Sequence, residues 1–63
     1  MKKIVVLRWK LVSEYSHEWC FFREGILIEE SLNCFHYQYL GIFGKIKNEW
    51  VDKKNYRYED VTE

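Results

Sequence analysis

Two pairs of residues in this chain carry side chains that bind zinc in many proteins. One pair is His17-x-x-Cys20 and the other is Cys34-x-His36. Structural zinc takes four Cys or His ligands in a tetrahedron, usually as two close pairs that the fold brings together. The first pair has the spacing of a zinc knuckle. One alternative for this chain is therefore a small structural zinc-binding domain.

Neither pair is a recognised zinc signature, however. Cys-x-His is tighter than the usual ligand spacing, and neither pair lies in the glycine-bearing turn that normally shapes a knuckle. Reduced cysteine is among the most buried residue types and often packs as a small hydrophobic side chain. We therefore expect no metal and no other cofactor, with the four residues in ordinary packing and surface roles.

Catalysis finds little support in the residue pattern. Cys34 with His36 is the only hint of a thiol beside a base, and a thiol nucleophile also needs an oxyanion hole. The sequence has no Gly-rich phosphate loop, no paired-carboxylate motif and no cofactor fingerprint. A chain of 63 residues also leaves little room for a substrate pocket of several hundred Å³. The expectation is a protein that is not an enzyme.

Strand-forming residues dominate the chain and predict a mainly β fold. The length indicates a single small globular domain over residues 1–63. Residues 4–12 are rich in β-branched and aromatic side chains, which favours a strand. Alternate residues of a strand share a face, so this segment should turn one apolar set toward the core. That set is Val5, Leu7, Trp9 and Leu11.

Turn signals divide the rest of the chain into short strands. A hairpin is predicted around Gly25 and a second one around the polar residues 52–55. Residues 34–40 alternate as a strand, although a helix over about 31–40, ended by Gly41, is an alternative. The predicted architecture is a small antiparallel sheet or partly closed barrel of five to six short strands. The alternative is an α+β fold, with that helix packed on three to four strands.

Composition favours a binding protein. Three Trp, five Tyr and four Phe exceed what so small a core can bury, and exposed aromatic residues are typical of protein interfaces. We expect a non-catalytic protein-binding module that acts as a modulator or inhibitor of another macromolecule. Accessory proteins of phages and mobile elements are often of this type. Homodimerisation is a related option, because open sheet edges invite pairing.

The C-terminal hairpin is the predicted partner-binding surface. Tyr56 and Tyr58 share one face of a strand, and Trp50 lies across the predicted turn. Lys53 and Lys54 would border this aromatic cluster, as charged residues border the apolar centre of many interfaces.

Single-stranded nucleic-acid binding by a small barrel is the second functional alternative. Lysines can follow phosphates while bases stack on aromatic side chains, and residues 8–10 and 45–58 interleave both types. Ten basic and ten acidic residues give no net charge, which weakens this alternative. Basic and aromatic residues would have to share one face.

Localisation is expected to be cytoplasmic. The apolar run at residues 4–7 is interrupted by Arg8 and Lys10, so it resembles neither a signal peptide nor a membrane span. In that compartment cysteines stay reduced.

Overall fold

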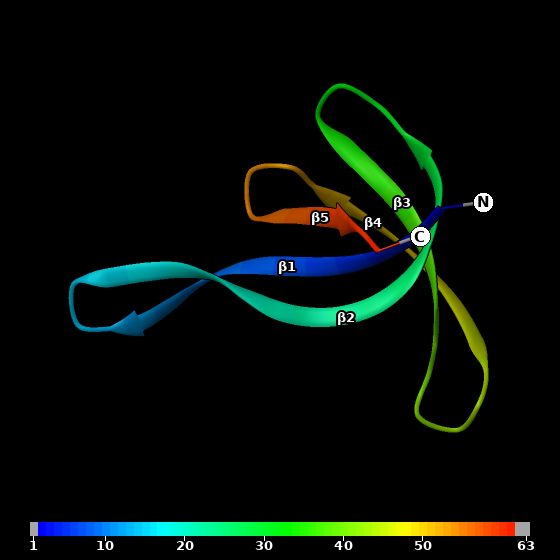
Figure 1. Ribbon diagram of the computed structural model, residues 1–63, viewed down its shortest axis with the longest axis horizontal. Helices are drawn as coiled ribbons and strands as arrows, with labels where there is room; N and C mark the ends of the chain where they lie inside the picture. The colour runs from blue at the N-terminus through cyan, green and yellow to red at the C-terminus, as the bar shows by residue number, and fades with distance from the viewer. Residues whose placement is uncertain (1, 62–63) are drawn as a thin grey trace.

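All of the regular structure in the computed structural model, which describes residues 2–61, is β-strand. Five strands form one antiparallel sheet in the order β4-β3-β2-β1-β5 (Figure 1). Their bounds are β1 Lys2–Ser13, β2 Ser16–Glu30, β3 Cys34–Leu40, β4 Ile46–Asp52 and β5 Tyr56–Asp60. The mainly β prediction is confirmed. The alternative helix over 31–40 is wrong, because most of this segment is β3. No helix in residues 2–61 could cross a membrane.

The sheet has to curl because its two edge strands are neighbours in the chain. β4 and β5 lie at opposite ends of the strand order, yet only residues 53–55 separate them. Four strand spacings in a flat sheet measure about 19 Å, whereas the chain from Asp52 to Tyr56 reaches at most about 14 Å. The sheet bends to close this difference but does not close into a barrel, since β4 and β5 do not pair.

The predicted hairpin around 52–55 is therefore wrong in its pairing, although both flanking strands exist. The turn is held from both sides: Lys53 N donates to Asn33 O at 2.9 Å, and Trp9 N donates to Asn55 O at 2.8 Å. Inside the turn, Asp52 Oδ1 accepts a hydrogen bond from Asn55 N at 2.9 Å. Asp commonly stabilises turns in this way.

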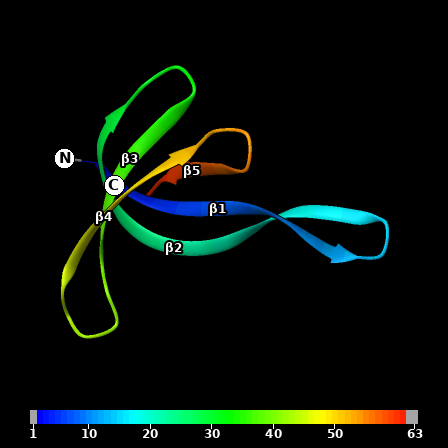
Figure 2. The same cartoon turned by 180° about the vertical axis from the view of Figure 1, so that it is seen from behind.

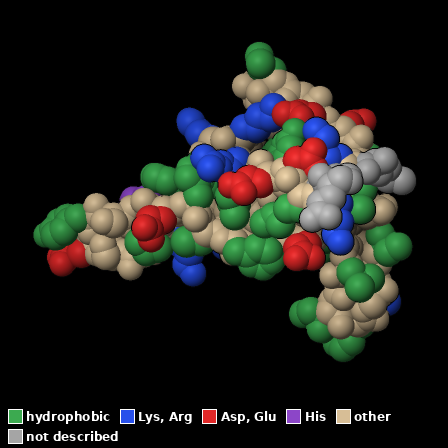
Figure 3. Space-filling model, viewed as in Figure 1, with side chains coloured by type: hydrophobic (Ala, Val, Ile, Leu, Met, Phe, Trp, Pro, Cys, Tyr) green, Lys and Arg blue, Asp and Glu red, His purple; other side chains and the backbone are tan. Residues whose placement is uncertain are grey.

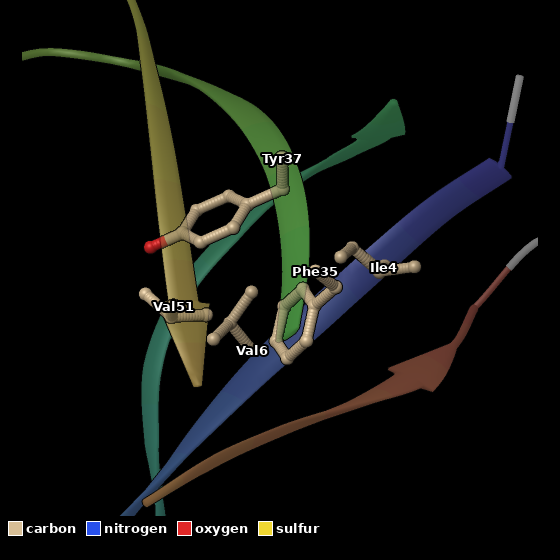
Figure 4. Packing of buried hydrophobic residues seen from close by; sticks show 5 residues of the cluster. All are labelled: Ile4, Val6, Phe35, Tyr37 and Val51. Atoms are coloured by element: carbon tan, nitrogen blue, oxygen red, sulfur yellow. The ribbon is translucent and has the colours of Figure 1, made fainter. Parts of the chain in front are cut away.

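The core lies on the concave face of the curled sheet (Figure 4). Five side chains are fully or almost fully buried there, and Tyr56 and Tyr58 pack against them. The predicted inward set of β1 is wrong, because the opposite set faces the core and Trp9 is 41% exposed. Both faces of residues 4–7 are apolar, so alternation alone does not decide between them. The buried residues are Ile4, Val6, Phe35, Tyr37 and Val51.

Gly25 lies inside β2 and not in a hairpin turn, so the predicted turn there is also wrong. It is opposite Ile4 in the ladder, and β3 crosses close beside it. A Cβ atom at this position would lie 2.5 Å from the backbone oxygen of Gln38 and 3.0 Å from the Tyr37 ring. Glycine is needed here for close packing of two strands.

A bulge in β2 directs the successive side chains of Phe22 and Arg23 to the concave face. Val6 pairs with Arg23 and Leu7 pairs with Phe21, which leaves Phe22 as the extra residue. The Arg23 guanidinium carbon lies 4.1 Å from the centre of the Phe22 ring and 4.0 Å from that of Tyr39. Bulges bend and twist a strand, so this one adds to the curvature of the sheet.

Two hairpins project from the curled centre, as Figures 1 and 2 show from opposite sides. One is the end of β1–β2, which turns at residues 14–15, and the other is the end of β3–β4, where Gly44 has a φ of 78°. The radius of gyration is 12.4 Å, against about 11 Å for a compact domain of this length. Much of the chain is therefore far from the core.

Candidate protein-binding surface

The face of the β1–β2 hairpin that points away from the core carries a continuous row of large apolar and aromatic side chains. Residues directly opposite in an antiparallel ladder share a face, and three successive opposing pairs make up this row. We call it the outer strip. Its pairs are Leu7 with Phe21, Trp9 with Trp19, and Leu11 with His17.

Ring contacts order the middle of the outer strip. Trp9 stacks on His17, with ring centres 5.6 Å apart and planes 11° from parallel. It also contacts Trp19, with ring centres 5.1 Å apart. The Arg57 guanidinium carbon lies 5.0 Å from the centre of the Trp19 ring, and Arg57 Nη2 lies 3.7 Å from Glu59 Oε1. The strip therefore has an aromatic centre with a charged border.

Much of the outer strip is open to solvent. Phe21 is 63% exposed and Leu11 is 54% exposed. The length of β1 explains this exposure. Its 12 residues extend about 40 Å, and β5 covers only the part over residues 4–8. The rest of the hairpin continues beyond the core, so its apolar side chains contact one another and Arg57 but not the core cluster.

An open groove of about 840 Å³ adjoins the outer strip and shares Phe21 with it. It lies where β2 and β3 diverge, and its wall includes Ile26, Tyr39 and Ile42. None of its described lining residues is Cys, His or Ser, so the groove offers apolar contact area and charge. Hydrophobic side chains also gather near the ends of both projecting hairpins (Figure 3).

The predicted aromatic patch at the C-terminal strands does not form. Trp50 points away from the core and stacks on His36, with ring centres 4.9 Å apart. Tyr56 and Tyr58 point inward, where Tyr56 contacts Phe22 at 5.5 Å and Tyr58 contacts Phe35 at 5.1 Å between ring centres. The patch required β4 and β5 to pair, and they lie at opposite edges of the sheet.

Lys53, Tyr56 and Tyr58 do come together, around a hollow of about 230 Å³ whose lining includes neither Trp50 nor Lys54. This volume is below the usual range for ligand pockets. Glu30 fills the polar side of the hollow: its carboxylate accepts hydrogen bonds from the Tyr58 hydroxyl and contacts Lys53 Nζ at 2.6 Å. These residues tie the end of β2 to β5 and to the turn before it.

The hydrogen bonds at this contact shift the pKa values of both Glu30 and Tyr58. The Lys53 ammonium and the Tyr58 hydroxyl stabilise the carboxylate and lower the pKa of Glu30. The same hydrogen bond to Glu30 is the main cause that raises the pKa of Tyr58. The contact therefore holds a charged carboxylate and a neutral phenol together.

The four residues of the zinc alternative lie in separate places. His17 stacks on Trp9 in the projecting hairpin, while Cys34 contacts Ser31 Oγ at 3.0 Å in the β2–β3 turn. β2 pairs with β3 only from residue 26 onward, so Cys20 lies in the part of β2 that does not run beside Cys34 and His36. Within residues 2–61, no group of three or more His, Cys, Asp or Glu side chains could hold a metal ion.

Comparison of the chain with models of protein families, with curated proteins and with solved structures found no match.

Proposed function

We propose that this chain is a non-catalytic protein-binding module, and that the outer strip is its contact surface. The observation that carries the proposal is the exposure of this strip beside a core of only five buried residues. Monomeric proteins rarely expose large contiguous apolar patches without a function. Trp and Arg are also the residue types most enriched among binding hot spots.

The shape of the hairpin supports action by occupation of another protein's surface. A projecting two-stranded arm with Trp9 and Phe21 on one face can place large side chains into an apolar depression. Arg57 and Glu59 at its border can make the polar contacts that surround such anchors. We propose a modulator or inhibitor of the partner, of the kind found among phage and mobile-element accessory proteins. We also propose that it acts in the cytoplasm.

The nucleic-acid alternative is less well supported by the geometry. It needs basic and aromatic residues on one face. Arg57 lies beside Trp19 on the outer strip, but it is paired with Glu59. Arg8 and Lys10 alternate with Trp9 and therefore point to the other face of β1. There the Arg8 guanidinium carbon lies 5.6 Å from the centre of the Phe22 ring, which packs against the core. Lys10 lies opposite Glu18 in the ladder, which further reduces the positive charge on that face. The arrangement favours protein as the partner.

Affinity capture from host lysate with matched variants tests the proposal. Trp9→Ala and Phe21→Ala alter the outer strip, while Phe43→Ala alters a side chain that is 90% exposed on the other hairpin and does not line the groove. We expect the strip variants to bind the captured protein about tenfold or more weakly, a typical hot-spot loss. The control should bind like the parent protein.

Melting temperatures separate binding from folding. Trp9→Ala should melt close to the parent, because Trp9 lies outside the core. If both strip variants keep the partner at parental affinity, or if Phe43→Ala loses it equally, the outer strip is not the contact surface.

A further inference from the structure

β4 leaves a long and regular backbone edge without a partner. It pairs with β3 along its whole length without a bulge, and no strand in residues 2–61 pairs with its other side. Proteins usually protect such edges with proline, bulges or very short strands. The chain has no proline, and β4 has seven residues against five in β5. Of the two outermost strands of the sheet, β4 is therefore better able than β5 to accept another strand.

Side chains on β4 alternate between a charged set and an apolar set. Lys47 and Glu49 lie on the same face as the core residue Val51, while Ile46 and Trp50 lie on the opposite face. Ile46 is 66% exposed and Trp50 is 51% exposed. Glu49 Oε2 lies 3.3 Å from Arg23 Nη1, and no ion pair within residues 2–61 involves Lys47.

Symmetry restricts how this edge can pair with itself. In an antiparallel pair of identical strands the two-fold axis is perpendicular to the sheet, so each residue keeps its face in both copies. Because opposing residues must share a face, only registers that place one residue opposite itself are allowed. The registers that pair most of β4, Ile46–Asp52, are therefore those with Asn48, Glu49 or Trp50 at the axis.

Charge selects one of these three registers. An axis at Glu49 places two carboxylates opposite each other. Like charges directly opposite destabilise a strand pair. An axis at Trp50 places Glu49 opposite the apolar Val51 of the second copy and forms no attractive charge pair. With Asn48 at the axis, Lys47 faces Glu49 of the second copy, and the symmetry repeats this attraction. The same register places Ile46 against Trp50 of the second copy, again twice.

We propose that two copies of this chain dimerise by antiparallel pairing of β4 with β4, with Asn48 opposite Asn48 of the second copy. The result is a continuous sheet across the two copies, with two attractive charge pairs on the core side and two apolar pairs on the other. The outer strip lies on the β1–β2 hairpin and stays uncovered. Dimerisation thus adds to the proposed function, because each dimer presents two strips.

Sedimentation velocity over about micromolar to millimolar concentrations measures dimerisation, and variants with a reversed charge at position 47 or 49 test the register. Lys47→Glu places carboxylates against Glu49 of the second copy, and Glu49→Lys places ammonium groups against Lys47 of the second copy. Two attractive pairs become repulsive in either case, so we expect each variant alone to dimerise about tenfold or more weakly. An equal mixture of the two variants should dimerise like the parent, because every cross-strand pair is again attractive.

Disulfide trapping provides a second measurement that leaves the Arg23–Glu49 ion pair in place. In a Cys20→Ser, Cys34→Ser background, Asn48→Cys brings two thiols directly opposite each other, within disulfide range. Lys47→Cys is the matched control, because its two copies lie diagonally about 7–8 Å apart. We expect mild oxidation to cross-link the Asn48→Cys chain much faster than the control.

Three results would each overturn the proposal. The first is a parent protein that stays monomeric at millimolar concentration. The second is a charge variant that dimerises as well as the parent, and the third is equal cross-linking at positions 47 and 48.

Discussion

Replacement of Tyr37 by Phe should stabilise this protein, although Tyr37 is a fully buried core residue. Its hydroxyl points toward β4 (Figure 4) and is buried without a hydrogen-bond partner among the described residues. A buried polar group without a partner costs about 1–3 kcal/mol. Tyr37→Phe removes that cost and keeps the ring. We expect a gain of about 1 kcal/mol at neutral pH, since loss of the oxygen also leaves a small void.

The same substitution should change the response to alkaline pH. Burial, and then the nearby Glu49 carboxylate, raise the pKa of Tyr37 from 10.0 to about 12. Because the pKa is higher in the folded state, the pH-dependent contribution of Tyr37 to stability is fully present below pH 10 and is lost as the pH rises toward 12. By pH 11 the free energy of unfolding of the parent should fall by about 1 kcal/mol through the ionisation of Tyr37. The Tyr37→Phe variant should not show this part of the loss.

Urea denaturation of the parent and the variant at pH 7 and pH 11 measures both effects. Tyr15→Phe is the control, because Tyr15 is 90% exposed at the hairpin turn and its replacement should change neither value. A variant less stable than the parent at pH 7 would mean that the Tyr37 hydroxyl has a favourable partner. Identical losses for parent and variant between the two pH values would mean that Tyr37 is not held neutral by burial.

Two further outcomes follow from the packing. Gly25→Ala should lower the free energy of unfolding by about 2–3 kcal/mol, because the new Cβ meets backbone atoms. Gly44→Ala should lower it by about 1–2 kcal/mol through its positive φ, since nothing lies within 4 Å of a Cβ there. A larger loss of stability at Gly44 than at Gly25 in thermal melts would contradict this. The lowered pKa of Glu30 predicts stability that is lost as pH falls below 4.5, and Glu30→Gln should reduce the difference in urea midpoint between pH 7 and pH 3. Equal differences in the two proteins would show that Glu30 is not held in its charged form.

Local pattern was enough to predict the strands but not how they are arranged. The alternation in residues 34–40 correctly favoured β3 over a helix. The alternation in β1 correctly grouped Val5 with Trp9, but both faces are apolar near its start, so the core side could not be decided. That choice depends on where Phe35 and Tyr37 lie, and their position follows from the curl of the whole sheet. Gly25 was misassigned for a similar reason, since its neighbour Gln38 is distant in sequence.

The predicted aromatic patch and the outer strip lie in different parts of the sheet. Tyr56 and Tyr58 were expected to be exposed together, yet they pack against the core, while the exposed pairs of the outer strip were not singled out. The pairing of β4 and β5 looked local because a short polar turn joins them, and nothing in that turn indicates that it connects opposite sheet edges. A signal for the outer strip was present in the length of the strand pattern over residues 4–12, which is too long for so small a core.

The position of β1 between β2 and β5 also has a consequence for synthesis of the chain. β1 can form its hairpin with β2 as soon as about thirty residues have left the ribosome, but its other edge pairs with residues 56–60. Until those residues emerge, the edge of the strand that carries Ile4 and Val6 stays unpaired, and the concave face is incomplete. Ladders between distant segments form late because the intervening chain must first be ordered. The nascent protein therefore passes through a stage in which β1 is an aggregation-prone edge.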